Sequence, residues 1–180
     1  AGSTAVIGST TVATLFAGIV SSGDPDVTPK DTGNAIGYAR SGGSLLNAPG
    51  GGYGADGAGS LVYALSVAPG GVDSGVETTS GTKIFLYAGS GSTAGLILGR
   101  VGNELAGGDT ANSGGAIAFA LAVNSGTGEA FIAQYLSLKH GNTASFDETI
   151  NLLAASVQMS VTRTDGDGDI ASDSDNNVGD

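Results

Sequence analysis

The stretch Ala116-Ile117-Ala118-Phe119-Ala120-Leu121-Ala122-Val123 alternates strictly between bulky apolar residues and alanine. Successive side chains of a β-strand point to opposite faces, so this pattern predicts a strand with one face in a core and a second, less buried face. The core face would carry Ile117, Phe119, Leu121 and Val123. This strand is the strongest single indication of the fold class.

Other segments repeat the alternation, and glycine-rich connections separate them. Large apolar residues occupy every second position in residues 61–67 and 157–161. Four further segments are strand candidates: residues 10–16, 83–88, 96–101 and 129–139. The connections are residues 23–59, 68–81, 89–95 and 102–115. Strands joined by turns without intervening helices predict an all-β fold, an antiparallel β-sandwich with long Gly-rich loops.

Composition limits the classes of partner. A chain of 180 residues suits one domain, residues 1–180, and its net charge of −11 argues against nucleic acid and anionic membranes. Cysteine is absent, which excludes disulfides, zinc–thiolate sites and thiol nucleophiles. The apolar runs are short and broken by glycine, so we expect no membrane insertion.

The sequence Asp165-Gly166-Asp167-Gly168-Asp169, followed by Asp173 and Asp175, places five carboxylates in eleven residues. No cationic side chain lies among them in the sequence, so a hard cation or water must screen their repulsion. Ca²⁺ takes six to eight oxygen ligands, and the glycines allow a tight turn that aims several oxygens at one point. A solvated acidic tail explains the pattern equally well. Residues 165–180 would form an acidic boundary segment of the domain.

Two other segments carry candidate calcium ligands. Gly51-Gly52-Tyr53-Gly54-Ala55-Asp56 matches the opening of the calcium-binding RTX nonapeptide, but a single copy cannot build a β-roll site. A Gly-rich loop is the better reading, in which Asp56 still serves as a ligand with partners from elsewhere. The second segment is the oxygen-rich loop 103–115, which is either a calcium site or an ordinary polar loop.

Catalytic motifs are scarce. His140 is the only histidine, and no G-x-S-x-G elbow accompanies it. The glycines of residues 89–95 precede a strand candidate rather than the helix that a dinucleotide loop needs. We therefore expect a protein that is not an enzyme.

Several stretches together resemble the repeat domains of giant type I-secreted RTX adhesins. They run in order from residue 54 to residue 170: Gly54-Ala55-Asp56-Gly57, residues 61–67, Thr79-Ser80-Gly81, Ile84-Phe85-Leu86, Gly99-Arg100-Val101-Gly102, residues 118–121, residues 134–140 and residues 161–169. Within that family the chain is most similar to the calcium-dependent peptide-binding module near the ligand-binding end.

The resemblance implies a monomeric extracellular β-sandwich with several bound Ca²⁺ ions, part of a larger adhesin at the bacterial cell surface and active in adhesion and biofilms. It also implies a pocket in which one ion receives the free C-terminal carboxylate of a peptide from a surface protein on another cell. Neighbouring adhesin domains would be further partners.

On this reading the site residues fall into three sets. Structural ions would be held by Asp165, Asp167, Asp169 and Asp56. The ligand-facing ion would be held by Asn103, Glu104, Asp109 and Asn112. Peptide contacts would come from Tyr53 and Arg40 in the long segment 23–59, and from Gly107, Gly108, Asp109 and Thr110, where backbone N–H groups can approach a peptide closely.

Two alternatives remain open. In the first, the chain is a structural extender in which calcium stiffens the junction with the next domain. In the second, it is a calcium-dependent carbohydrate-binding module, which the low aromatic content of 6% and the absence of Trp disfavour.

Overall fold

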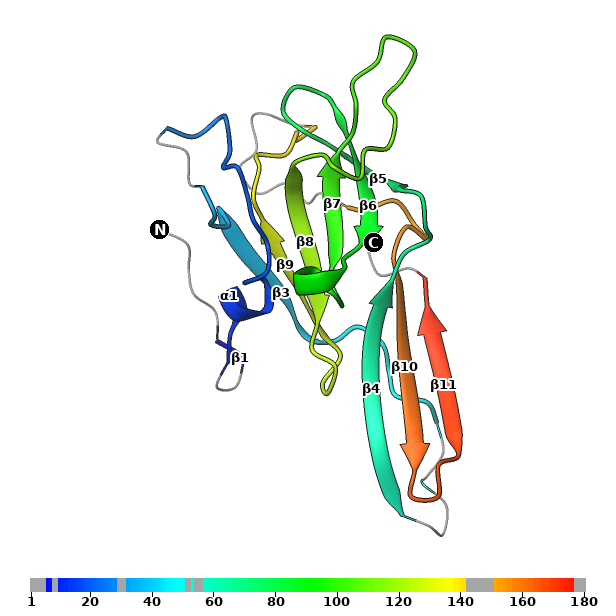
Figure 1. Ribbon diagram of the computed structural model, residues 1–180. Coiled ribbons are helices and arrows are strands. Elements are labelled where there is room, and N and C mark those ends of the chain that lie inside the picture. Colours follow the sequence, from blue (N-terminus) through cyan, green and yellow to red (C-terminus); the bar gives the residue numbers. More distant parts are fainter. Residues whose placement is uncertain are drawn as a thin grey trace.

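A computed structural model describes residues 6–7, 10–28, 32–50, 53, 57–141 and 151–176. The fold is all-β, with two main antiparallel sheets (Figure 1). Its strands are β1 (Val6–Ile7), β2 (Thr10–Thr11), β3 (Gly37–Ser44), β4 (Ala58–Ser66), β5 (Val72–Glu77), β6 (Lys83–Ala88), β7 (Ile97–Val101), β8 (Ile117–Val123), β9 (Glu129–Gln134), β10 (Gln158–Asp165) and β11 (Ile170–Asp175). Two short helical turns, α1 (Val12–Leu15) and η1 (Gly91–Thr93), complete the elements of the described residues.

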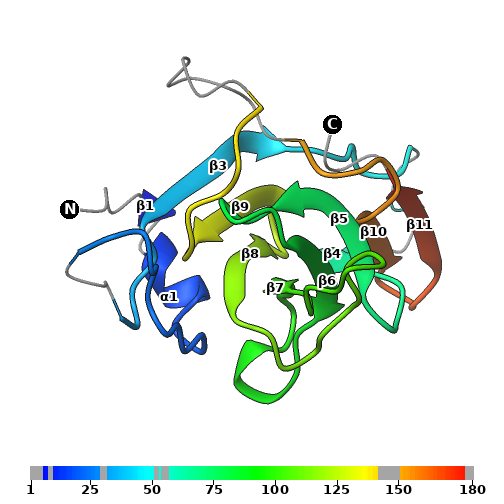
Figure 2. The ribbon, with the colours of Figure 1, turned by 90° about the horizontal axis from the view of Figure 1, so that it is seen from above.

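The larger sheet has six strands in the order β3-β9-β8-β7-β6-β5, and every neighbouring pair is antiparallel. Figure 2 shows this sheet curled rather than flat. Apolar clusters cover both of its faces. One cluster joins Phe131 to Val12 and Phe16 of the N-terminal segment, and the other is centred on Phe119.

The smaller sheet has the order β11-β10-β4 and extends beyond one end of the six-stranded sheet (Figure 1). Met159 and Val161 of β10 are fully buried against Tyr63 and Leu65 of β4, as the alternation of both segments predicts. Leu46 joins this cluster from the segment that follows β3. The two sheets and their cores confirm the predicted all-β antiparallel sandwich class.

The structure confirms the predicted strand at β8, but the four residues predicted for its core face do not share one face. Phe119 and Leu121 lie in one cluster, whereas Ile117 packs with Ala120 and Ala122 in the other. The pairing with β7 shifts between Gly99 and Arg100, and the carbonyl of Ala118 accepts the N–H groups of both Tyr135 and Leu136. A bulge places one extra residue in β8, so the side chain of Ile117 points to the opposite face from the one that strict alternation predicts.

The predicted strand of residues 10–16 is also wrong beyond Thr11. Val12, Phe16 and Ile19 are the buried residues of this stretch, at 1%, 3% and 6% exposure. Their spacing of four and three residues is the spacing of a helix face, and α1 begins at Val12. The predicted strand 129–139 ends at Gln134.

Three strands lie in segments that the sequence predicts as connections or as an acidic tail: β3, β5 and β11. β3 lies inside the predicted loop 23–59 and forms an edge of the larger sheet. All six residues of β11 are exposed. A strand that is exposed on both faces carries no apolar alternation, which is why β11 has no signal in the sequence.

Candidate metal centre

The turn that joins β10 to β11, residues 165–169, gathers three carboxylates. Ligand atoms of Asp165, Asp167 and Asp169 all lie within 4.8 Å of one another. Among the residues that the structure describes, this is the one group of three or more His, Cys, Asp or Glu side chains so arranged. The sequence-predicted set Asp165, Asp167 and Asp169 is therefore brought together.

Asp165 organises the backbone of this turn. Its Oδ1 atom accepts the N–H groups of Gly168 and Asp169 at 3.1 and 2.8 Å. Gly168 has a φ of 100°, a left-handed conformation that favours glycine. The glycine between the last two aspartates thus lets the chain fold back so that the three side chains converge.

The electrostatics of the turn favour a cation. A hydrogen bond with the Asp167 side chain, assisted by backbone N–H donors from residues 167–169 and opposed by burial, holds the pKa of Asp165 below its ordinary value. Carboxylates this close repel each other, and either a shared proton or a cation relieves that repulsion. Near neutral pH a proton is scarce on such groups, so a cation is the natural counter-charge.

A small cavity of about 140 Å³ adjoins the turn and is lined by Asp165, Asp169, Arg163 and Tyr53, among others. The guanidinium of Arg163 lies over the ring of Tyr53, 5.1 Å from its centroid. A cationic side chain therefore lies beside the acids, contrary to the expectation from the sequence alone. Three carboxylates and one guanidinium still leave a formal surplus of two negative charges.

Strand β4 supports the turn from the other side. The carbonyl of Gly57 accepts the N–H of Gly166 at 3.1 Å, and Ala58 pairs with Asp165 across a bulge. A side chain at Gly59 would overlap the backbone carbonyl oxygens of Thr164 and Asp165. Asp56 itself lies outside the described residues, so its predicted role stays a prediction.

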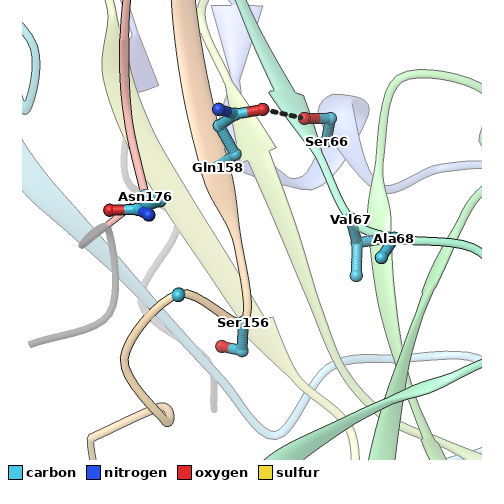
Figure 3. A pocket seen from close by; sticks show the side chains of 7 residues that line it. Ser66, Val67, Ala68, Ser156, Gln158 and Asn176 are labelled. Atoms are coloured by element: carbon cyan, nitrogen blue, oxygen red, sulfur yellow. Dashed lines mark hydrogen bonds between the residues drawn. The ribbon is translucent and has the colours of Figure 1, made fainter.

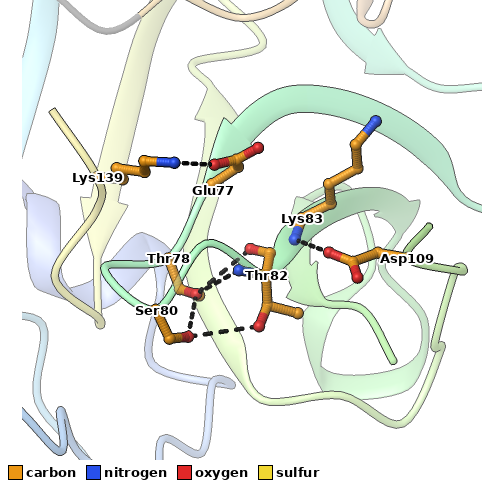
Figure 4. A network of polar contacts seen from close by, with 7 residues as sticks. All are labelled: Glu77, Thr78, Ser80, Thr82, Lys83, Asp109 and Lys139. Atoms are coloured by element: carbon orange, nitrogen blue, oxygen red, sulfur yellow. Dashed lines mark hydrogen bonds and ion pairs between the residues drawn. The ribbon is translucent and has the colours of Figure 1, made fainter. Parts of the chain in front are cut away.

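The second predicted ligand set, Asn103, Glu104, Asp109 and Asn112, lies in the connection between β7 and β8 and stays a prediction. Asn103 and Thr110 form a two-way backbone bridge of 2.9 and 3.1 Å, and Asn112 donates to the side chain of Asn103. Asp109 accepts the backbone N–H of Lys83 at 2.6 Å, so it caps the start of β6 (Figure 4). Glu104 is exposed. The loop is an ordered hairpin whose polar groups largely satisfy one another.

The predicted peptide-contact residues lie in three different parts of the fold. Arg40 lies on edge strand β3, where it pairs with Glu129 at 3.4 Å. Gly107 and Gly108 lie in the hairpin loop between β7 and β8, and Tyr53 adjoins the 165–169 turn. The sequence therefore identifies the acidic turn but does not predict which other residues surround it.

A further cavity, of about 360 Å³, lies at the end of the three-stranded sheet where β4 finishes and β10 begins. On one wall Ser66 donates to Gln158 of the paired strand at 3.4 Å, and Asn176 lies opposite Val67 and Ala68 (Figure 3). None of the predicted site residues lines this cavity. Its lining is uncharged, which distinguishes it from the acidic turn.

Comparison with known proteins identifies a family but no individual relative. No curated protein and no solved structure matches the chain. No helix among the described residues is long and apolar enough to cross a membrane. The sequence model of one family, described as Domain of unknown function (DUF5801), matches residues 3–177. The chain therefore belongs to the DUF5801 family.

Proposed function

We propose that the chain is a calcium-binding module of an extracellular bacterial adhesin, in which Ca²⁺ at the 165–169 turn stiffens the three-stranded sheet. The observation that carries this proposal is the convergence of three carboxylates within 4.8 Å at the end of a hairpin. Ca²⁺ accepts carboxylate, carbonyl and water oxygens together, and an exposed turn leaves room for water in the coordination shell.

The position of the turn favours a structural role. It joins the exposed edge strand β11 to β10, at the tip of the sheet that extends away from the larger core (Figure 1). An ion that links residues on either side of this turn would restrain the two strands against each other. This arrangement supports the extender role more directly than peptide capture, because the predicted peptide-contact residues lie apart. The resemblance to RTX adhesins supports a calcium-binding adhesin module, although within that family it favours the peptide-binding member.

Calorimetric titration of Ca²⁺ into the chain tests the metal site. We expect Asp167→Asn to weaken binding about tenfold, because one of three anionic ligands becomes neutral. Asp173→Asn is the matched control, since Asp173 is an exposed aspartate of β11 outside the group of three. Equal affinities for both variants and the parent chain would refute the site.

Peptide capture is tested separately with peptides that have free or amidated C-termini, in Ca²⁺ and in EDTA. If binding requires both Ca²⁺ and the free carboxylate, the module is a ligand-binding domain rather than an extender. Binding of calcium without binding of any peptide supports the extender role.

A further inference from the structure

A second candidate site lies at the end of the six-stranded sheet where β5, β7 and β9 finish and β6 and β8 begin. A cavity of about 340 Å³ opens there. That volume lies at the lower end of the range of small-molecule sites. Four parts of the chain line it: the segment 22–26, the turn 78–80, the facing ends of β7 and β8, and the segment that follows β9.

A buried carboxylate is its first notable feature. Asp24 lines the cavity and is only 1% exposed. Its Oδ2 atom accepts the backbone N–H and the hydroxyl of Ser137 at 2.7 and 2.6 Å, and its Oδ1 atom accepts the N–H of Asp26 at 3.0 Å. A carboxylate offers about four acceptor positions, so one remains on Oδ1.

A second carboxylate stands at the rim. Asp26 is exposed, and its Oδ2 atom accepts the hydroxyl of Thr79 at 2.6 Å. All the donors to these two carboxylates are neutral. Among the ion pairs of the described residues, none involves Asp24 or Asp26. Within the described part of the chain, the pair therefore presents two negative charges without a basic partner.

Neighbouring groups do not supply the missing charge. The ammonium of Lys139, two residues after Ser137, binds Glu77 at 2.7 Å (Figure 4). In the same view Ser80 hydrogen-bonds to Thr78 and Thr82, so these three hydroxyls of the β5–β6 turn satisfy one another. None of the described residues that line the cavity is Lys, Arg or His, which makes an anionic ligand unfavourable there.

Four lining residues form an apolar wall: Pro25, Val101, Ala116 and Leu136. A bare metal ion gains nothing from such a wall, whereas an alkyl chain does. We propose that this cavity binds a primary ammonium group on an alkyl stem, with the ammonium between Asp24 and Asp26 and the stem against the apolar wall. Either a lysine side chain of a partner protein or a small free amine has this chemistry.

NMR titration of the full chain with n-butylammonium in saturating Ca²⁺ tests the proposal, with n-butanol as the neutral isostere. We expect saturable shifts of the amides of residues 22–26, 79 and 137 with butylammonium only. Asp26→Asn should weaken this binding about fivefold, as for loss of one exposed ion-pair partner. Asp173→Asn, in the other sheet, should leave it unchanged.

Asp24→Asn provides a second variant, and its folding is checked by the dispersion of amide resonances distant from the cavity. If it folds, butylammonium binding should be lost. Three results would each overturn the proposal: equal binding of butanol, equal weakening in Asp173→Asn, or weaker binding of the amine in saturating Ca²⁺ than in EDTA. Nα-acetyl-lysinamide, titrated in the same way, separates the two sources. Tighter binding of this compound than of butylammonium assigns the site to a lysine of a protein partner.

Discussion

The two sheets of this molecule are stabilised in different ways. The six-stranded sheet is covered on both faces, and its central strand β8 has five of its seven residues buried. The three-stranded sheet buries a short apolar row on one face, and all six residues of its edge strand are exposed. Apolar packing therefore covers both faces of the first sheet, whereas the second sheet has one apolar row and, on the proposed function, a cation that neutralises the acids at its tip.

The largest effect should come from the larger core. Phe119 is 1% exposed at the centre of the cluster on one face. Phe119→Ala should lower the free energy of unfolding by about 3–5 kcal/mol, since it removes the ring and leaves a cavity. Urea denaturation measures this, with Val62→Ala as control because Val62 is 48% exposed on β4. An equal loss in Ca²⁺ and in EDTA is expected, and a loss that vanished in Ca²⁺ would contradict the division between the sheets.

A smaller effect should come from the strand that supports the acidic turn. Gly59→Ala should destabilise the chain by about 1–3 kcal/mol and weaken Ca²⁺ binding, because the new methyl group overlaps the backbone of Thr164 and Asp165. Gly37→Ala is the matched control, since Gly37 also lies in a strand and has open space around it. Urea denaturation and calcium titration of both variants give the comparison. Unchanged calcium affinity in Gly59→Ala would show that β4 does not position the turn.

The smallest effect concerns pH. The pKa of Asp165 is lowered in the folded turn, so the ionised form stabilises the turn above the ordinary pKa of 3.8. That contribution is lost as the pH falls through the folded-state value. In EDTA, the amide resonances of Gly168 and Asp169 should therefore shift with a midpoint below 3.8. Asp165→Asn should abolish this transition and leave the resonances of β8 unchanged. A midpoint above 3.8 would contradict the prediction, because it would mean that folding raises the pKa of Asp165 instead of lowering it.

The sequence predicts the strands and turns that neighbouring residues determine. It does not predict the features that depend on residues far away along the chain. Alternation identifies β8 and β10, and the D-G-D-G-D spacing identifies the 165–169 turn, because neighbours in the chain determine both. The exposed strand β11 has no apolar pattern to reveal it.

Other parts of the candidate sites depend on hydrogen bonds between residues that are far apart in the sequence. The role of Asp109 as a cap for β6 spans 26 residues, and the bond from Ser137 to Asp24 spans 113 residues. No periodicity or motif encodes such separations. The ligand set predicted in the 103–112 loop therefore stays a prediction. The length and the aspartates of segment 23–59 indicate a binding loop, but the sequence does not show which distant residues meet Asp24 there.

Hydrogen exchange followed by mass spectrometry, in Ca²⁺ and in EDTA, tests most directly whether calcium stabilises the three-stranded sheet. We predict that Ca²⁺ slows exchange in peptides that cover β10, the 165–169 turn and β11, and leaves β7 and β8 unchanged. Asp167→Asn should remove the difference. Equal exchange of the turn in both conditions, or slowing spread evenly over both sheets, would contradict the claim.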